Sequence, residues 1–229
     1  MQNRSHAVMS QRTEANDSPD DFPTPPWATR ALLEHVVVNR TALSKQACLE
    51  PACGAGHMAK VLNEYFAKVE CSDAFDYGYG RVQDFIAQSY REHTFDWVIT
   101  NPPFRLAEKF LTRSLKVARV GVAIFARTVF LESVSRYNTI FQTTPPTIFA
   151  QFVERVPIVR GRLDGKATTA TGYAWFIWDK RMNSTQPQLA WIPPCRRELE
   201  RPGDYEATKS LRQSKREGQG ALGYSFLSN

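Results

Sequence analysis

Short apolar runs alternate with stretches of helical periodicity along most of the chain. Runs rich in β-branched and aromatic residues predict strands at 47–50, 69–72, 97–100, 120–126, 148–153 and 173–178. Apolar residues at helical spacing predict helices that begin at Trp27 or cover 57–67, 106–117 and 130–141. This alternation predicts a doubly wound α/β fold, in which helices cover both faces of a mostly parallel sheet.

The two ends of the chain lack this alternation. Residues 1–20 are polar without apolar periodicity and are predicted to be disordered. We assign residues 21–182 to one α/β domain, and the polar, charged stretch 183–229 to a C-terminal extension that is either a small appendage or a flexible basic tail. The sequence shows neither an apolar run of roughly 18 residues, which a bilayer requires, nor the apolar core of an export signal. A cytoplasmic protein without a membrane partner is expected.

Composition agrees with one globular domain, and the net charge favours a polyanionic partner. Of the 229 residues, 42% are hydrophobic and 23% are charged, which is ordinary for a soluble α/β domain. The net charge of +6 suits a nucleic acid, because Lys and Arg contacts to phosphates release counterions, although many basic proteins bind none. The cysteines show no metal-ligand spacing, so we expect reduced thiols and no metal at Cys48, Cys53, Cys71 and Cys195.

A glycine-bearing turn follows the first predicted strand, with the sequence Glu50-Pro51-Ala52-Cys53-Gly54-Ala55-Gly56. Gly54 and Gly56 allow a tight backbone turn and the close approach of a ligand, at the sheet edge where doubly wound folds bind ligands. A dinucleotide site would carry a third glycine in a G-x-G-x-x-G pattern, which this turn lacks. The turn therefore predicts a nucleoside-type ligand site, and a turn without a ligand remains the alternative.

Acidic residues follow the second predicted strand. Asp73 ends that strand, where a carboxylate can accept hydrogen bonds from a ribose. Asp84 can read an adenine edge while Phe85 or Ile86 covers the face of the ring. The alternatives stay open, because Asp73 also suits a helix cap or a turn, and Asp84 also suits a solvated surface position.

The stretch Asn101-Pro102-Pro103-Phe104 follows the predicted strand 97–100. Two consecutive prolines remove two backbone donors and stiffen the loop, and Pro102 biases Asn101 away from the helical region. The amide oxygen of Asn101 and the carbonyl of Pro102 can then accept both hydrogens of one NH₂ group, while Phe104 stacks on the planar ring that carries it. Accepting both hydrogens makes a delocalised amine nitrogen more tetrahedral and more nucleophilic.

Together these motifs resemble the N6-adenine DNA methyltransferases, and amino-methyltransferases more widely, over about residues 21–180. The glycine turn is similar to their cofactor loop, and residues 101–104 are similar to their catalytic motif. Phe22-Pro23-Thr24-Pro25 resembles the upstream motif that contacts the methionine part of the cofactor, and Asp84-Phe85 resembles their adenine-reading pair. The order of the motifs matches the group whose target-recognition part follows the catalytic domain, and small phage and prophage methyltransferases share this layout.

The resemblance implies a Rossmann-like methyltransferase sheet that binds S-adenosylmethionine and methylates an adenine, with DNA as the favoured nucleic acid. Asp73 would bind the cofactor ribose, and Asp84 the cofactor adenine. Glu50 would orient the methionine or ribose end, and Thr24 the methionine carboxylate. The implied cofactor-binding residues are Phe22, Thr24, Glu50, Pro51, Ala52, Cys53, Gly54, Gly56, Asp73, Ala74, Asp84, Phe85 and Asn101. The implied catalytic residues are Asn101, Pro102, Pro103 and Phe104.

The resemblance also implies how the target adenine is presented. The base is flipped out of the duplex, stacks on Phe104 and is methylated directly, without a metal and without a covalent enzyme intermediate. Basic residues between the last two predicted strands suit phosphate contacts, and these are Arg155, Arg160, Arg162 and Lys166. The basic residues of the C-terminal extension can equally form a solvated face. Because few residues follow the catalytic domain, we expect a short or relaxed target site.

Three other functions remain compatible with the motifs. A glutamine amide in a protein also presents a planar NH₂ group, although enzymes that methylate it more often carry tyrosine at the position of Phe104. Structured RNA is a second possible substrate, and Phe104 does not exclude it. A non-catalytic nucleic-acid-binding module with a degenerate cofactor pocket is the third, and the intact Gly54, Gly56 and Asn101 argue against it.

Overall fold

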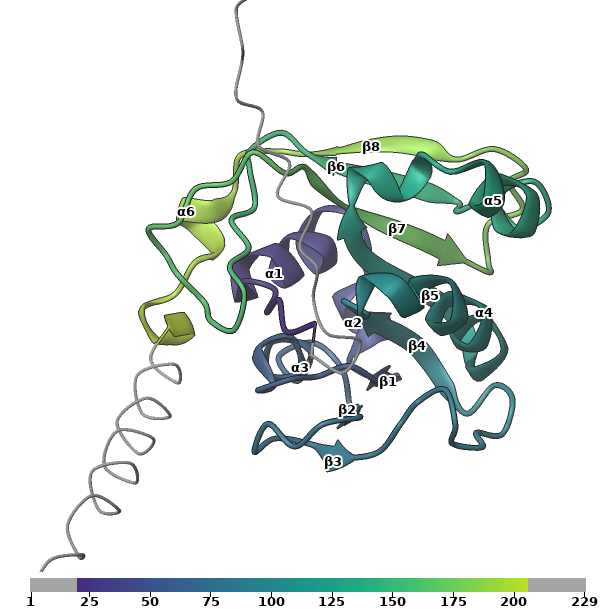
Figure 1. Cartoon of the computed structure of the whole chain (residues 1–229), viewed down its shortest axis with the longest axis horizontal. Helices are drawn as coiled ribbons and strands as arrows, with labels where there is room; N and C mark the ends of the chain where they lie inside the picture. The colour runs from purple at the N-terminus through teal and green to yellow at the C-terminus, as the bar shows by residue number, and fades with distance from the viewer. Residues whose placement is uncertain (1–19, 206–229) are drawn as a thin grey trace, which may run out of the picture.

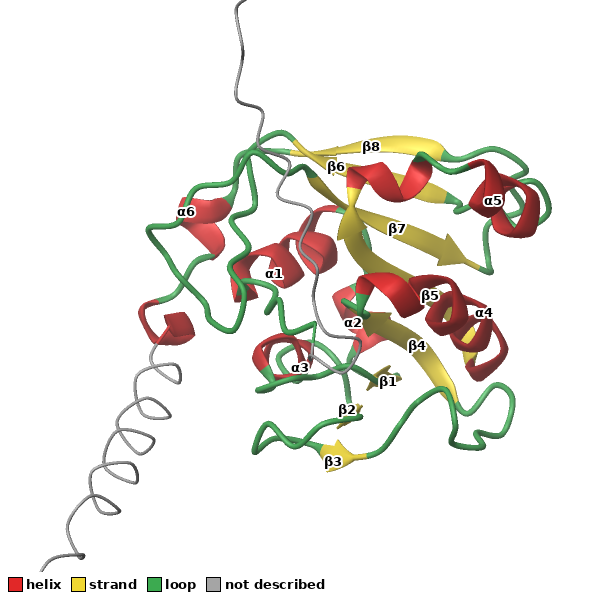
Figure 2. Ribbon diagram, viewed as in Figure 1, coloured by secondary structure: helices red, strands yellow, loops and turns green. Residues whose placement is uncertain are grey.

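A computed structural model describes residues 20–205, which form one mixed eight-stranded sheet with helices on both faces (Figures 1 and 2). The predicted disorder of the N-terminus lies, apart from Asp20, outside the described residues. The strand order is β3-β2-β1-β4-β5-β7-β6-β8. The strands are β1 (Ala47–Glu50), β2 (Lys68–Asp73), β3 (Arg81–Val82), β4 (Phe95–Thr100), β5 (Ala118–Arg127), β6 (Ile148–Phe152), β7 (Tyr173–Asp179) and β8 (Gln188–Ile192).

Alternating side chains of the central strands pack into two apolar cores, one on each face of the sheet. In β5, Phe125 packs into the core beneath α1 and α3, whereas Ile124 packs into the core beneath α4. Figure 1 accordingly shows α1 and α3 on one side of the sheet and α4 on the other. The α-helices are α1 (Pro26–His35), α2 (Arg40–Leu43), α3 (His57–Leu62), α4 (Ala107–Val117), α5 (Val134–Arg136) and α6 (Arg196–Leu199). The predicted doubly wound α/β fold is confirmed.

Strand direction decides which side chains meet at the edge of the sheet where ligands bind. Strands β3, β2, β1, β4 and β5 run parallel, whereas β7 runs antiparallel between β5 and β6. The carboxyl end of β5 therefore lies beside the beginning of β7, and Arg127 pairs with Tyr173. The sequence does not show this reversal, so it could not place Tyr173 at the same edge as the glycine turn.

The predicted helix over 130–141 begins later than expected, at Val134. That stretch consists of a 3₁₀ turn, η2 (Thr128–Leu131), the single helical turn α5 and a π-helical turn, η3 (Tyr137–Phe141). Ser133 has an extended backbone, with φ −162° and ψ 124°, and its hydroxyl accepts a hydrogen bond from the Arg136 amide. This side-chain bond starts a new helical turn at Val134 and interrupts any helix entering from Thr128.

Part of the predicted C-terminal extension belongs to the sheet. Strand β8 pairs in parallel with β6, and Ile192 is fully buried opposite Phe152. Helix α6 packs against α1, where Arg30 binds Asp204, Glu64 and the carbonyl of Leu199. The boundary at residue 182 thus divides one sheet. Sequence reasoning missed β8 although residues 189–192 form a short apolar run, because that run lies between proline-containing segments of an otherwise polar stretch.

Candidate functional site

The loop between β1 and α3 has the tight geometry that its glycines predict. Gly54 and Gly56 take positive φ angles of 49° and 80°, and a Cβ atom on Gly56 would lie 2.3 Å from the Tyr79 ring. The amide of Gly54 donates a hydrogen bond of 2.9 Å to Asp73 Oδ2. Asp73 Oδ1 accepts a second bond, of 3.0 Å, from the amide of Phe75. Asp73 therefore ties the glycine loop to the end of β2 and fixes the wall of a cavity.

This cavity, which we call the acidic cavity, has a volume of about 260 Å³ and lies at the carboxyl ends of β1, β2 and β4. Pro51, Phe85 and Phe110 contribute apolar side chains to its wall. No Lys or Arg side chain among residues 20–205 lines it. Its carboxylates are Asp20, Asp21, Glu50, Asp73 and Asp84. Phosphate groups would be repelled here, so the cavity favours a ligand that carries positive charge.

Burial and mutual repulsion raise the pKa values of several of these carboxyl groups. Burial is the main cause for Glu50, whose pKa lies well above its usual range, and the neighbouring Asp73 adds to the rise. The same two causes, in the same order, raise the pKa of Asp21. One oxygen of Glu50, Oε2, is buried without a hydrogen-bond partner among the described residues. A buried carboxyl oxygen without a partner at the wall of a cavity is an acceptor that a bound ligand can satisfy.

The histidine at the start of α3 does not offset the acidic charge. His57 lines the acidic cavity and is buried, and that burial lowers its pKa to about 4, with the charge of Lys60 adding to the effect. The imidazole is therefore neutral near pH 7.

Asn101, directly after β4, is held by its amide hydrogens. Its Nδ2 donates to the carbonyl of Phe22 at 2.8 Å and to Thr24 Oγ1 at 3.0 Å. Both hydrogens are thus used within the protein, and Oδ1 remains as the acceptor, with no hydrogen bond from residues 20–205. The amide is therefore fixed before any substrate arrives, as a catalytic hydrogen-bond acceptor requires.

A second, smaller pocket of about 40 Å³ adjoins the acidic cavity, and we call it the Phe104 pocket. Asp20, Phe22 and Asn101 line both spaces, so the two meet at Asn101. The Phe104 ring is 42% exposed, and the Arg127 guanidinium lies 5.5 Å from its centroid. Tyr173 forms the far wall and stacks in parallel on Phe125, with 5.2 Å between ring centroids. The pocket thus brings aromatic side chains beside a fixed amide oxygen.

The structure brings together nearly all residues that the sequence singled out for the cofactor. Each of them except Gly56 lines the acidic cavity. Gly56 instead shapes the turn behind it. Asp84 is exposed at the rim and accepts a hydrogen bond from the Ile86 amide, whereas Phe85 is buried against Phe110. Phe85 therefore serves the core as well as the cavity wall.

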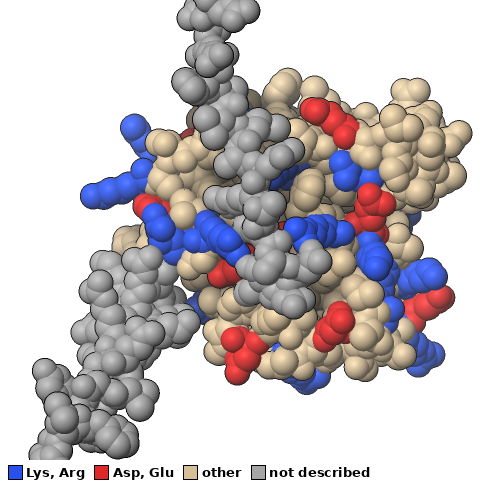
Figure 3. Space-filling view, viewed as in Figure 1, with Lys and Arg blue, Asp and Glu red and all other residues tan. Residues whose placement is uncertain are grey.

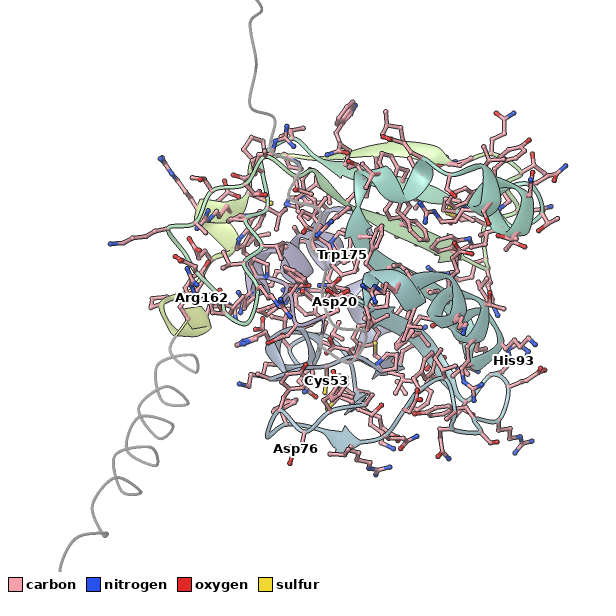
Figure 4. All side chains as sticks on the ribbon, in the orientation of Figure 1. Asp20, Cys53, Asp76, His93, Arg162 and Trp175 are labelled. Carbon is pink, nitrogen blue, oxygen red and sulfur yellow. The ribbon has the colours of Figure 1, made fainter. Side chains whose placement is uncertain are left out.

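Sequence reasoning missed several residues of the two spaces. Asp20 lies between Trp175 and Cys53 in the middle of the view in Figure 4, and its carboxylate accepts a 2.8 Å bond from the Phe104 amide. Two adjacent acids directly before Phe22 were the available signal for Asp20 and Asp21. Tyr173 had no local signal, because only its pairing with Arg127 brings it to the Phe104 pocket.

The four basic residues predicted to bind nucleic acid lie in the loop between β6 and β7, as expected. The loop docks onto the cavity rim, since the amide of Gly161 donates to the carbonyl of Asp21 at 2.8 Å. Arg162 is paired with Asp164 at 3.2 Å, whereas Arg155 binds only a carbonyl, that of Ala170, among the described residues. In Figure 3, Lys and Arg side chains form a band across the middle of the visible face. Basic charge is therefore available beside the two spaces.

Comparison with known proteins yields matches in structure alone. No protein-family model matches the chain, and no curated protein sequence matches it. A protein described as a class I S-adenosylmethionine-dependent methyltransferase from Listeria monocytogenes superposes with a TM-score of 0.53 at 11% identity, covering 86% of this chain and 72% of that one. A protein described as an RNA methyltransferase from Pyrococcus horikoshii gives 0.52 at 12% identity, covering 73% of this chain and 92% of that one.

A third similar structure is described as the modification subunit of a type I restriction enzyme from Vibrio vulnificus. Its TM-score is 0.53 at 12% identity, and the match covers 88% of this chain and 54% of that subunit. The chain has the class I methyltransferase fold. In this methyltransferase fold, the acidic cavity and the Phe104 pocket lie where doubly wound sheets bind ligands, outside the carboxyl ends of the strands.

Among residues 20–205, no group of three or more His, Cys, Asp or Glu side chains is arranged to hold a metal ion. None of the helices in this part of the chain is long and apolar enough to cross a bilayer.

Proposed function

We propose that this protein transfers a methyl group from S-adenosylmethionine to the exocyclic amine of an adenine in nucleic acid, with DNA as the main substrate. One observation carries the proposal: the acidic cavity and the Phe104 pocket meet at Asn101, whose amide oxygen is fixed and open to a donor. A cationic methyl donor on one side and a planar amine on the other would then face each other at that residue.

The acidic cavity fits the proposed cofactor in charge. S-adenosylmethionine carries a sulfonium, an ammonium and a carboxylate group, so its net charge is positive, and the cavity offers several carboxylates and no lining Lys or Arg side chain among residues 20–205. Asp73 at the end of β2 would bind the ribose, and Asp84 at the rim would bind the adenine amine. The buried Glu50 oxygen without a partner would receive a hydrogen bond from the methionine end.

The chain's own residues account for activation of the amine. Asn101 Oδ1 and the carbonyl of Pro102 would accept the two amine hydrogens, which localises the nitrogen lone pair. Phe104 and Tyr173 would hold the base between them, so that the nitrogen is aligned with the acidic cavity. The sulfonium supplies an electrophilic methyl carbon. The new bond to nitrogen would replace the bond between the methyl carbon and sulfur, and Asn101 and Pro102 would hold the nitrogen while its displaced proton passes to solvent.

The proposal is tested by incubating the full chain with labelled S-adenosylmethionine and unmethylated DNA, RNA or protein, followed by digestion and identification of the modified unit. N6-methyladenine from DNA is the expected product. N6-methyladenine from RNA alone would identify RNA as the substrate. N5-methylglutamine would identify a protein amide as the methyl acceptor. Label in none of the three would contradict the proposed activity.

Cofactor affinity should depend on pH through Glu50. Burial raises the pKa of this carboxyl, so it holds its proton to a higher pH than an ordinary glutamate. A cationic ligand favours the ionised form, so binding should release a proton, and affinity should rise with pH until the raised pKa of the free protein is passed. Titration calorimetry in two buffers of different ionisation enthalpy measures the release. Glu50→Gln should lose this pH dependence, whereas proton-neutral binding by the wild type would refute the assignment.

A further inference from the structure

Beyond the Phe104 pocket, the same edge of the sheet continues into a third space of about 490 Å³, which we call the edge recess. Tyr173 lines both the Phe104 pocket and the edge recess, so the two adjoin. The recess reaches β8, the last strand of the sheet, and its walls include Thr128, Gln151, Arg155, Gly172, Tyr173 and Trp191. Neither the cofactor nor the target base occupies it in the proposed reaction.

The most unusual side chain of the edge recess is Trp191. Its side chain is 63% exposed, whereas the other four tryptophans of the chain are at most 3% exposed. Trp191 pairs with Gln151 in the β6–β8 ladder. It therefore lies near the carboxyl end of β6, at the same end of the sheet as the Asn101 loop. An exposed indole beside a nucleic-acid-modifying site is suited to stack on a base.

A cation lies in the same recess. Arg155 is exposed, its Nη1 donates to the carbonyl of Ala170 at 3.2 Å, and it forms no ion pair with any of the residues 20–205. A Cβ atom on Gly172 would lie 3.4 Å from Arg155 Nη1 and 3.0 Å from Thr128 Oγ1, so the guanidinium and the hydroxyl flank that glycine. The acid next in sequence, Glu154, is engaged elsewhere, because its Oε1 accepts 2.8 Å bonds from the amides of Cys195 and Arg196.

We propose that the edge recess binds a nucleotide that flanks the target adenine, with its base stacked on Trp191 and its phosphate held by Arg155 and Thr128. The proposal rests on the nucleic-acid substrate proposed above. Arg127 on β5 and Trp191 on β8 are separated by three strand spacings, or about 14 Å at roughly 4.8 Å each. That span matches a few nucleotides at roughly 3.4 Å per base. Trp191 would thereby contribute to the choice of flanking sequence.

Binding is tested first by fluorescence with a short single-stranded DNA that contains one adenine. Because Trp191 is the exposed tryptophan, acrylamide should quench its emission selectively, and the oligonucleotide should protect it. Protection should disappear in Trp191→Phe and persist in Trp178→Phe, which removes a buried indole. An accessible Trp191 in the presence of saturating oligonucleotide would overturn the proposal.

Kinetics then separate a role in binding from one in folding. Trp191→Ala should raise the KM for the oligonucleotide about 10-fold with kcat within about twofold, and Trp191→Phe should recover most of the affinity. Leu189→Ala is the matched control, because Leu189 is 56% exposed on the same strand, two residues earlier, and does not line the recess. Arg155→Ala should reduce the slope of log affinity against log salt by about one.

Further measurements distinguish a failure of the edge-recess proposal from a failure of the proposed methyl transfer. Removing nucleotides that flank the adenine should raise KM for the wild type and leave KM of Trp191→Ala unchanged. An unchanged KM in Trp191→Ala, with loss of a dimer on gel filtration, would assign the recess to a second copy of the chain and overturn the proposal. DNA that protects Trp191 without ever being methylated would refute the proposed function while supporting the recess as a nucleotide site.

Discussion

Asn101→Ala should lower kcat about 100- to 1,000-fold while the affinity for S-adenosylmethionine changes only a few-fold. The substitution removes the oxygen that would accept an amine hydrogen, and loss of one preorganised hydrogen bond in an active site typically costs this much. The amide is preorganised by its two bonds to Phe22 and Thr24, so the acceptor oxygen has a single orientation. Single-turnover kinetics with labelled cofactor measure kcat, and calorimetry measures cofactor affinity.

A second variant distinguishes a catalytic effect of this change from a purely structural one. Asn101→Asp keeps an acceptor oxygen but loses both donors to the 22–24 segment, so we expect it to retain more activity than Asn101→Ala. If cofactor affinity collapsed as far as kcat in Asn101→Ala, Asn101 would be an anchor for the 22–24 segment and not the acceptor. A kcat equal to that of the wild type would exclude Asn101 from the reaction.

Asp73→Ala should weaken S-adenosylmethionine binding about 10- to 100-fold. A carboxylate that accepts hydrogen bonds from a ribose is worth roughly 1.5–3 kcal/mol, and its loss also frees the amides of Gly54 and Phe75. Because a ligand that binds the folded state raises the unfolding temperature according to its affinity, the cofactor should stabilise the variant less than the wild type. Thermal unfolding with and without cofactor, together with calorimetry, measures the difference.

Asp76→Ala is the matched control for this experiment. Asp76 lies three residues further along and accepts one bond of 2.8 Å from the Gly78 amide, but it does not line the acidic cavity (Figure 4). We expect its substitution to leave cofactor affinity unchanged. Equal affinities for the wild type and both variants would remove Asp73 from the cofactor site.

Local sequence patterns were sufficient for the central elements and for most of the candidate site. Strand β1 begins and ends where the apolar run predicts, and the glycine turn and the Asn101 loop follow buried strands. Such patterns are reliable because a strand buried on both faces needs a continuous apolar run, and a tight turn at a positive φ angle needs glycine. Parallel strands then bring their carboxyl ends to one edge, so the residues that follow them line one cavity.

Patterns failed where a side chain or a distant strand decided the outcome. The hydroxyl of Ser133 divides a stretch whose spacing favours one helix, and the short apolar run of β8 lies within a polar, proline-flanked stretch that hides it. Tyr173 and Trp191 are far from the motifs along the chain. They reach the ligand-binding edge only through the antiparallel β5–β7 pairing and the parallel β6–β8 pairing.

By itself, the sequence determined the doubly wound fold, the residues around the acidic cavity and the chemical character of the Asn101 loop. Each of these depends on residues close together in the chain, where backbone sterics and hydrophobic periodicity act directly. Only the tertiary structure decided that the acidic cavity meets the Phe104 pocket at Asn101, that Asp20 holds the Phe104 amide, and that an exposed Trp191 extends the same edge. These features arise from strand order and direction, which follow from packing of the whole chain.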